Sequence, residues 1–165
     1  LADIQQCGEQ LLAANGYAQY EVSAYSQRGC QCRHNTNYWS FGDYLGIGAG
    51  AHSKISFLDG RVERYAKRRQ PEEYMSAGPG NFVANTRMLD QADILGEFML
   101  NALRLNEGFS LPQFVSRTGL NHELLEPRLE SLCRRELLLY EGDVIRATET
   151  GRRFLDSVIA EFFPD

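Results

Sequence analysis

The chain has 165 residues, 43% of them hydrophobic, and a formal net charge of -5. This length and composition fit one ordinary domain or two small ones with a packed core, and they exclude a disordered tail. Apolar runs fall short of the roughly 20 residues that cross a bilayer, and no signal peptide pattern opens the chain, so we expect a cytoplasmic protein without a membrane span.

The charge is unevenly distributed. Residues 90–165 contain eight Lys and Arg against fourteen Asp and Glu, a balance of -6, whereas residues 1–89 contain nine against eight. An acidic surface repels phosphates, so we expect no nucleic acid partner. The chain opens without an initiator Met and in the middle of a helical pattern, which predicts that it is a piece of a longer protein.

The first forty residues predict a helix, a strand and a loop. Apolar residues recur at helical spacing over residues 2–15, and Gly16 is a suitable C-terminal cap. Residues 17–25 alternate between apolar and polar residues, as in a strand with one face toward solvent. A helix followed directly by a strand is half of an α/β repeat unit. Residues 26–37 are polar and predict a loop that carries His34 to a site.

Two short extended segments and a helix follow the glycine-rich run. Asp59-Gly60 is a strong two-residue turn signal, so residues 51–58 and 61–66 are predicted to pair as an antiparallel hairpin. Pro71 favours a helix start, with the helix continuing to Ala77. We place a domain boundary near residues 82–90, which gives domains of residues 1–85 and 86–165.

The second domain is predicted to be mostly helical. Residues 94–105 present a long apolar helical face, Ser110 can cap a short helix to residue 117, and Asn121 can cap another to residue 135. Two short strands, 137–140 and 144–147, and a last helix over 150–162 complete it. This order is typical of a winged-helix module.

The stretch from His34 to His52 has the richest ligand chemistry. It contains two of the three histidines, the only tryptophan and four of the fifteen glycines. An imidazole followed by aromatic side chains could hold the iron of a planar macrocycle, with Tyr38 and Trp39 on its faces. The alternative is structural: a hydrogen-bonded His34, a turn residue at Asn35 and a core anchor at Trp39.

The glycine run has two interpretations. Gly46, Gly48 and Ala51 fit the dinucleotide fingerprint, but that fingerprint must open a helix, and here a strand-like run follows. These glycines and Gly50 therefore permit either close backbone packing or the approach of a ligand plane. His52 is a second polar ligand at the same site or an ordinary strand residue.

Cysteines and cations offer weaker candidates. Cys30 and Cys32, close to His34, form only half a zinc site, so reduced thiols are expected and a metal role for either sulfur stays open. Five cations lie between Arg61 and Arg69. They could receive carboxylates or phosphates of a ligand, or they protect a solvated strand edge from mispairing.

The combined string resembles one family. His34-Asn35-x-x-Tyr38-Trp39, the run from Gly42 to Ser53 and the preceding residues 20–23 resemble the HemW heme chaperones, which are radical S-adenosylmethionine (SAM) proteins. Residues 97–105 resemble the start of that family's C-terminal domain, so the resemblance covers essentially the whole chain. Authentic coproporphyrinogen III dehydrogenases carry a different string at these positions, which favours the chaperone branch.

The resemblance implies a fold, a ligand and partners. The fold would be the end of a radical-SAM partial (β/α) barrel, followed by a winged-helix-like HemN/HemW C-terminal domain. The ligand would be heme or a porphyrin, with His34 as candidate iron ligand and with a surrounding site formed by Asn35, Tyr38, Trp39, Gly46, Gly48, Gly50 and His52. The implied partners are a heme-acceptor protein and the N-terminal radical-SAM core of the same chain.

The family's three-cysteine motif is missing from these residues. A [4Fe-4S] cluster and SAM would therefore be bound elsewhere in the longer protein, and this piece alone would not be an enzyme. Two alternatives stay open at this point. One is part of an oxygen-independent coproporphyrinogen III oxidase of porphyrin biosynthesis, and the other is a winged-helix nucleic-acid-binding regulator.

Overall fold

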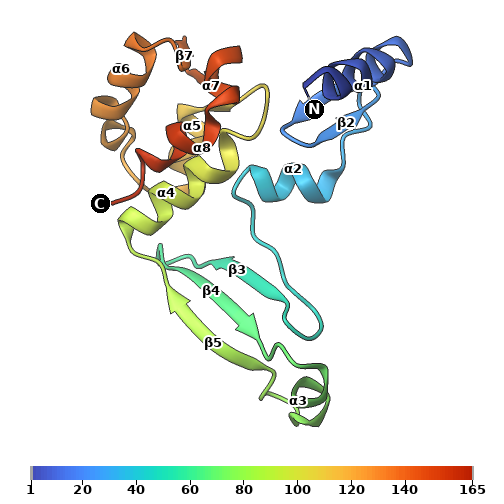
Figure 1. Ribbon diagram of the computed structural model, residues 1–165. Coiled ribbons are helices and arrows are strands. Elements are labelled where there is room, and N and C mark those ends of the chain that lie inside the picture. Colours follow the sequence, from blue (N-terminus) through green and yellow to red (C-terminus); the bar gives the residue numbers. More distant parts are fainter. Residues whose placement is uncertain (1, 165) are drawn as a thin grey trace.

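The computed structural model describes residues 2–164 and shows a mixed α and β protein with three small antiparallel sheets. Figure 1 shows a helical body that contains the C-terminus, a three-stranded sheet projecting from it, and the N-terminal helix standing apart. None of the helices in residues 2–164 is both long and apolar enough to cross a membrane.

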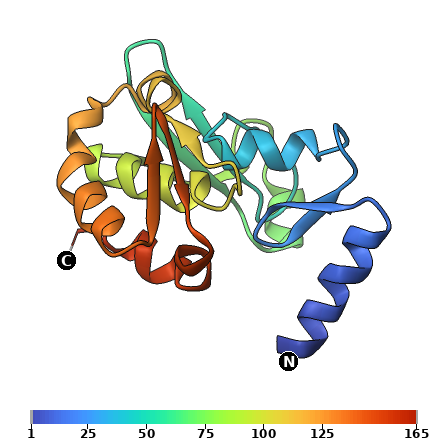
Figure 2. The same ribbon diagram turned by 90° about the horizontal axis from the view of Figure 1, so that it is seen from above.

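The N-terminal part is a helix followed by a hairpin. Helix α1 (Ala2–Ala14) ends before Gly16, whose positive φ of 80° confirms the predicted cap. The predicted single strand over 17–25 is wrong, because β1 (Ala18–Glu21) turns back into the antiparallel β2 (Ala24–Ser26). The Glu21 carboxylate closes that turn by accepting hydrogen bonds from the Ser23 amide and hydroxyl at 3.0 and 2.8 Å. In Figure 2, α1 extends away from the rest of the chain.

The predicted loop over residues 26–37 is wrong in its second half, where α2 (Arg33–Trp39) forms. No residue of α2 is fully buried, so it lacks the apolar stripe from which helices are usually recognised. Two large aromatic residues at its C-terminal end anchor the helix instead, and these are described with the site below.

The second sheet has the order β3-β4-β5, formed by β3 (His52–Ser56), β4 (Val62–Lys67) and β5 (Val83–Met88). The predicted hairpin is confirmed, with β3 antiparallel to β4 and Gly60 in the turn at a φ of 87°. Helix α3 (Pro71–Ser76) is also confirmed and lies between β4 and β5. The third strand was not predicted: β5 lies within the segment of residues 82–90 assigned to a boundary.

The C-terminal part begins with α4 (Gln91–Ala102), which starts with a capping box. Asp90 accepts a hydrogen bond from the amide of Asp93 at 2.8 Å, and Asp93 accepts one in return. Ser110 caps α5 (Leu111–Thr118) as predicted. Asn121 instead caps a 3-10 turn, η1 (His122–Leu124), and α6 (Glu126–Arg134) begins only afterwards, so the predicted helix start at 121 is wrong.

The third sheet and the last helices complete the body. The predicted hairpin is confirmed as β7 (Leu138–Glu141) and β8 (Val144–Ala147), while β6 (Phe109–Ser110) is too short to give a sequence period. The predicted last helix is divided at Phe154 into α7 (Glu149–Arg153) and α8 (Leu155–Ala160). This break accompanies the burial of Leu155, Val158 and Ile159 in the core.

A cluster of aromatic rings forms the centre of the core. Phe98 of α4 is fully buried and makes edge contacts with Phe41, Phe109 and Phe114, at centroid distances of 5.7, 4.9 and 5.0 Å. Phe41 lies two residues after the end of α2. The segment that carries the predicted site is therefore packed into the same core as the C-terminal helices.

Candidate functional site

Helix α2 distributes the predicted site residues over two sides. His34 and Tyr38 are four residues apart and so share one side, and Asn35 and Trp39 share another. His34 is exposed, in the first turn of the helix. The Tyr38 ring lies 4.9 Å from Trp39 and 5.1 Å from Tyr44 by centroid. An open imidazole therefore shares a helix side with an aromatic ring that packs against a second tyrosine.

The Asn35 and Trp39 side holds α2 against the N-terminal hairpin. The Asn35 amide donates a hydrogen bond to the Tyr20 hydroxyl at 3.4 Å, and the Arg104 guanidinium lies 4.3 Å from the Trp39 ring centroid. Arg104 also donates to the buried carboxylate of Glu21 at 3.1 Å. These contacts fix the orientation of α2 and leave the His34 side open.

The glycine run lies along the free side of β3. Tyr44 and Lys54 exchange two backbone hydrogen bonds of 3.0 and 3.1 Å, which places the run beside the strand. The Gly46 amide donates to the Ser53 hydroxyl at 3.0 Å. A Cβ on Gly46 would stand 2.1 Å from the His52 carbonyl oxygen, so this position requires close backbone packing. Gly48 and Gly50 have positive φ values of 104° and 69°, which side chains disfavour.

We expect Gly46→Ala to lower the free energy of unfolding by about 1–3 kcal/mol, because the new methyl group must push the run away from β3. Urea unfolding followed by circular dichroism measures this. Gly8→Ala is the matched control, since a Cβ there meets nothing within 4 Å and the position is helical. That control should be neutral or stabilising. Equal effects of the two substitutions would contradict the packing described here.

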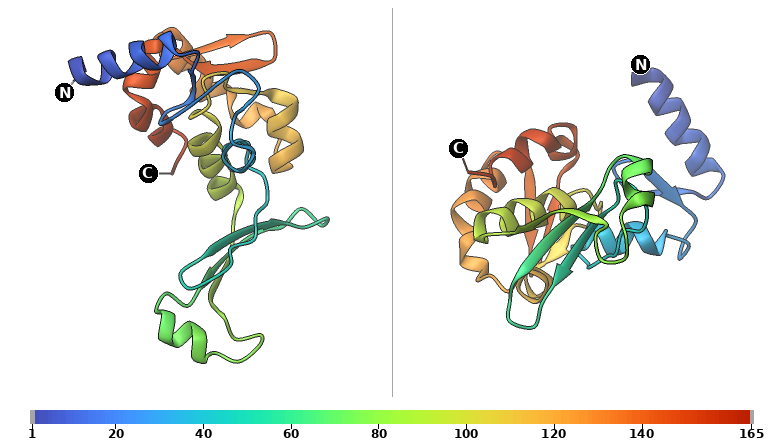
Figure 3. Two further views of the ribbon diagram at one scale, coloured as in Figure 1. Left: turned by 90° about the vertical axis from the view of Figure 1, so that its right-hand side faces the viewer. Right: turned by 90° about the horizontal axis from the view of Figure 1, so that it is seen from below.

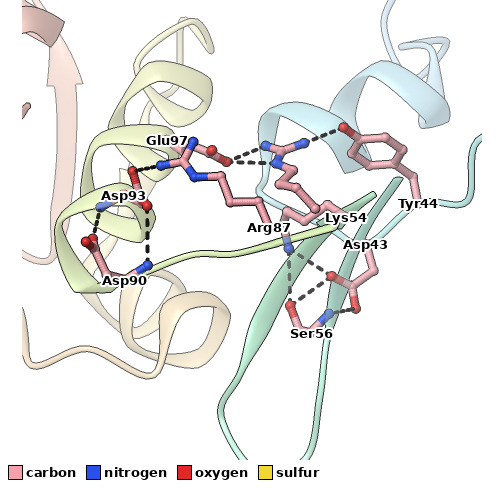
Figure 4. Close-up of polar contacts among 9 residues, drawn as sticks. Asp43, Tyr44, Lys54, Ser56, Arg87, Asp90, Asp93 and Glu97 are labelled. Carbon is pink, nitrogen blue, oxygen red and sulfur yellow. Dashed lines mark hydrogen bonds and ion pairs between the residues drawn. The ribbon is translucent and has the colours of Figure 1, made fainter. Parts of the chain in front are cut away.

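A buried ammonium group lies next to the glycine run. Lys54 is 1% exposed; its Nζ lies 2.8 Å from Asp43 Oδ1 and 4.1 Å from the Phe41 ring centroid. Ser56 donates its amide and hydroxyl to the same carboxylate at 2.9 and 2.8 Å (Figure 4). Burial alone raises the pKa of Asp43, but the hydrogen bonds from Lys54 and Ser56 outweigh it and leave that pKa below its ordinary value. Burial lowers the pKa of Lys54, and Asp43 offsets part of that effect.

A second ionic contact joins the sheet to α4. Arg64 donates to Glu97 Oε2 through its Nε at 2.9 Å and to the Tyr44 hydroxyl through another nitrogen. Burial is the main cause that raises the pKa of Tyr44 to about 12. Sequence reasoning missed Asp43, Lys54 and Glu97 as site supports, because their partners are distant in sequence.

The predicted basic cluster is partly neutralised by local partners. Arg61 pairs with Asp59 and Glu63, each at 2.8 Å, and Arg64 pairs with Glu97. Arg68 donates its Nε to the carbonyl oxygen of Asn81 at 3.0 Å. These partners favour the structural interpretation of the cluster over a ligand-binding one.

The structure keeps His34 and His52 in separate elements. His34 belongs to α2, whereas His52 is exposed at the start of β3, opposite Ala66. Within residues 2–164, neither imidazole has a hydrogen-bonding partner. Both histidines are exposed, so their rings are open to a ligand.

The cysteines lie apart from any cluster-binding arrangement. Cys30 and Cys32 are free and exposed. Among the described residues, no three His, Cys, Asp or Glu side chains are grouped so that they could hold a metal ion. The residues that the structure describes therefore do not fit a [4Fe-4S] cluster, whereas a single open imidazole fits an axial ligand of heme.

Comparison with known proteins finds relatives of the chain. Residues 89–154 match the family described as the HemN C-terminal domain. The heme chaperone HemW of Escherichia coli K12 is 41% identical over the whole chain, which covers 43% of that protein, and HemW of Haemophilus influenzae is 36% identical, with 42% of that protein covered. The chain thus spans about two fifths of the length of these curated relatives.

A solved structure shows the same fold at much lower identity. It is titled "Coproporphyrinogen III oxidase (HemN) from Escherichia coli is a Radical SAM enzyme" and superposes with a TM-score of 0.63 at 16% identity. The match covers 98% of this chain and 40% of that one. Over its whole length the chain is thus similar to the HemW proteins, and its residues 89–154 match the HemN C-terminal domain.

Proposed function

We propose that this chain is the heme-binding part of a heme chaperone that delivers heme to an acceptor protein. The observation that carries the proposal is the open His34 imidazole, which shares a side of α2 with the Tyr38 ring. A neutral imidazole nitrogen is a common axial ligand of heme iron, and aromatic rings pack well on the macrocycle. Heme is cargo in this proposal, so an exposed ligand suits both its uptake and its release.

The other predicted residues support His34 in distinct ways. Asn35 and Trp39 hold α2 in place, so the imidazole is presented from a fixed helix. Gly46, Gly48 and Gly50 leave three positions of the run after α2 without a side chain, and the exposed His52 at its end offers a second nitrogen ligand. The names of the relatives favour this function over a coproporphyrinogen oxidase or a nucleic-acid-binding regulator.

The longer protein would supply the remaining chemistry. We propose that residues 1–85 form the end of a radical-SAM barrel and that residues 86–165 form a winged-helix-like domain. The boundary between these two proposed domains lies close to residue 89, where the family match begins. Ile4 and Leu11 of α1 are 73% and 67% exposed, which suits packing against a preceding core. A [4Fe-4S] cluster and SAM would bind in that core.

Heme titration tests the proposal. We expect His34→Ala to weaken heme binding at least about tenfold and to alter the Soret band, because the substitution removes the iron ligand. The titration uses absorbance and tryptophan quenching, the latter reporting on Trp39, the only tryptophan.

His122→Ala is the matched control, because it removes another exposed imidazole, in η1, and should leave the titration unchanged. His52→Ala shows whether a second imidazole contributes. Unchanged binding in the His34 variant would remove His34 from the site. Unchanged binding in both the His34 and His52 variants would argue against an imidazole-ligated heme on this chain.

A further inference from the structure

A cavity of about 310 Å³ opens where three segments of the chain meet. It lies between the C-terminal part of α4, the α7–α8 segment and the turn of the β1–β2 hairpin. The right view of Figure 3 shows the hairpin beyond the C-terminal end of α4, with α8 beside α4. We call this cavity the arginine pocket, because Arg104, Arg152 and Arg153 are among the residues that line it. None of the residues proposed above to bind heme lines it, so it is a separate feature.

Half of the lining of the arginine pocket is apolar. Leu155 and Ile159 of α8 line it and are buried. Val22, Leu100 and Phe154 also line it, but their large apolar side chains stay exposed. Small-molecule sites in proteins are concave and largely apolar, with volumes from about 300 Å³ upward. The arginine pocket is at the small end of that range, so it suits a ligand with one ring or one branched chain rather than a porphyrin.

Two of the three guanidinium groups have unused hydrogen-bond donors. Within residues 2–164 the Arg104 side chain makes one hydrogen bond, from Nη2 to Glu21 at 3.1 Å, and its buried Nε has no partner. Arg152 is hydrogen-bonded through its backbone amide, to the Thr148 carbonyl, and its guanidinium pairs with no described residue. A guanidinium has five N–H groups in a planar fork that matches the two oxygens of a carboxylate. Both arginines can therefore accept a further anionic partner.

The charges that line the arginine pocket favour an anion. Asp156 is the only acidic residue of the lining, against three arginines, and it forms no ion pair with a described residue. Arg153 pairs with Glu149 at 2.6 Å, but the two side chains are 72% and 76% exposed, and such surface pairs contribute little. Residues 90–165 have a balance of -6, yet three of their eight cations gather here. This local excess of cations attracts negative charge to an otherwise acidic part of the chain.

We propose that the arginine pocket binds a small organic acid, which is a carboxylate on an apolar body. The guanidinium of Arg152 and the unused donors of Arg104 hold the carboxylate. The apolar body covers the exposed side chains of Leu100 and Phe154 and so removes apolar surface from water. Inorganic phosphate or sulfate would satisfy the arginines but leave that apolar surface uncovered. The concave shape and small volume favour a free acid over a segment of another protein.

Titration with 3-phenylpropionate tests the proposal, and the neutral amide of this acid is the matched control ligand. Binding to the 165-residue chain is followed by Trp39 fluorescence, because the Arg104 guanidinium lies 4.3 Å from that ring centroid. The NMR shifts of the Leu100 and Ile159 methyl groups, which line the pocket, give a second measurement. We expect saturable binding of the acid with a Kd of about 1 mM, typical of a ligand of this size. The amide should bind at least about tenfold more weakly, because it carries no charge for the arginines.

Arg152→Gln tests the role of the free guanidinium. The substitution breaks no ion pair among residues 2–164, so the fold should persist by circular dichroism, and we expect the Kd of the acid to rise at least about fivefold. Arg117→Gln removes another exposed arginine, on α5 and outside the pocket, and should leave the Kd unchanged. Equal effects of these two substitutions, an amide that binds as tightly as the acid, or methyl shifts that do not saturate would each overturn the proposal. Heme is absent from these titrations, so their outcome is independent of the proposed function.

Discussion

Phe98→Ala lowers the free energy of unfolding by about 3–5 kcal/mol, the cost typical of emptying a fully buried phenylalanine site. The loss is at the upper end of single substitutions because Phe98 is completely buried and its ring makes edge contacts with Phe41, Phe109 and Phe114. Three neighbouring rings cannot all collapse into the space. Chemical denaturation with fluorescence and circular dichroism measures the change.

Phe154→Ala serves as the control for this substitution. Phe154 is 58% exposed, between α7 and α8, so its truncation should cost well under half as much. Because Phe41 lies close after α2 and packs on Phe98, the Phe98 variant should also weaken the heme binding that we propose for α2. A Phe98 variant as stable as the Phe154 variant would contradict the core described here.

Asp43→Ala is expected to destabilise the chain by about 3 kcal/mol, because it leaves the buried Lys54 ammonium without its carboxylate. This loss of stability lies at the low end of the range for removing one partner of a buried ion pair, since Asp43 itself is 42% exposed. Lys54→Met should cost less, because a carboxylate near solvent can hydrate while methionine fills the buried space. Urea unfolding of the two single variants and the double variant measures the asymmetry.

Combining the substitutions should restore much of the stability that Asp43→Ala alone removes, since no unpaired buried charge is left.

Stability at acidic pH provides an independent check of the Asp43–Lys54 pair. The pKa of Asp43 is depressed in the folded state, so its contribution is fully present above the ordinary value of 3.8 and is lost as the pH falls through the folded value. The Asp43→Ala variant should therefore lose less stability than wild type when acidified below pH 3.8. Additive single effects and identical acid profiles would refute the coupling.

Turn and capping residues in the sequence were sufficient to predict the helices and hairpins that they begin or end. Asp59-Gly60 marks the turn between β3 and β4, and Ser110 with Gly119 brackets α5, because each acts through its own backbone geometry. Helix α2 was missed because its stabilising contacts come from elsewhere in the chain, such as Arg104 on the Trp39 ring. Strand β5 was missed because its pairing partner β4 lies across a helix and a turn.

The candidate site shows the same difference between features that a local sequence pattern predicts and features that depend on contacts formed only in the fold. The sequence singled out His34 and its aromatic neighbours, and the structure places His34 and Tyr38 on one side of α2. It gave no sign that Lys54 is buried, because a lysine in a strand is ordinarily solvated, and its burial depends on contacts with Asp43, Ser56 and Phe41. Whether heme binds at His34 stays a prediction.

The edge contact of Phe41 with Phe98 has a consequence for cooperativity. Because this ring connects the segment after α2 to a fully buried residue of α4, the segment cannot separate without opening the core. Amide hydrogens of the Phe41 segment should therefore exchange only through global unfolding, together with those of α4. A ligand that binds α2 then raises the melting temperature of the C-terminal helices as well as that of its own helix.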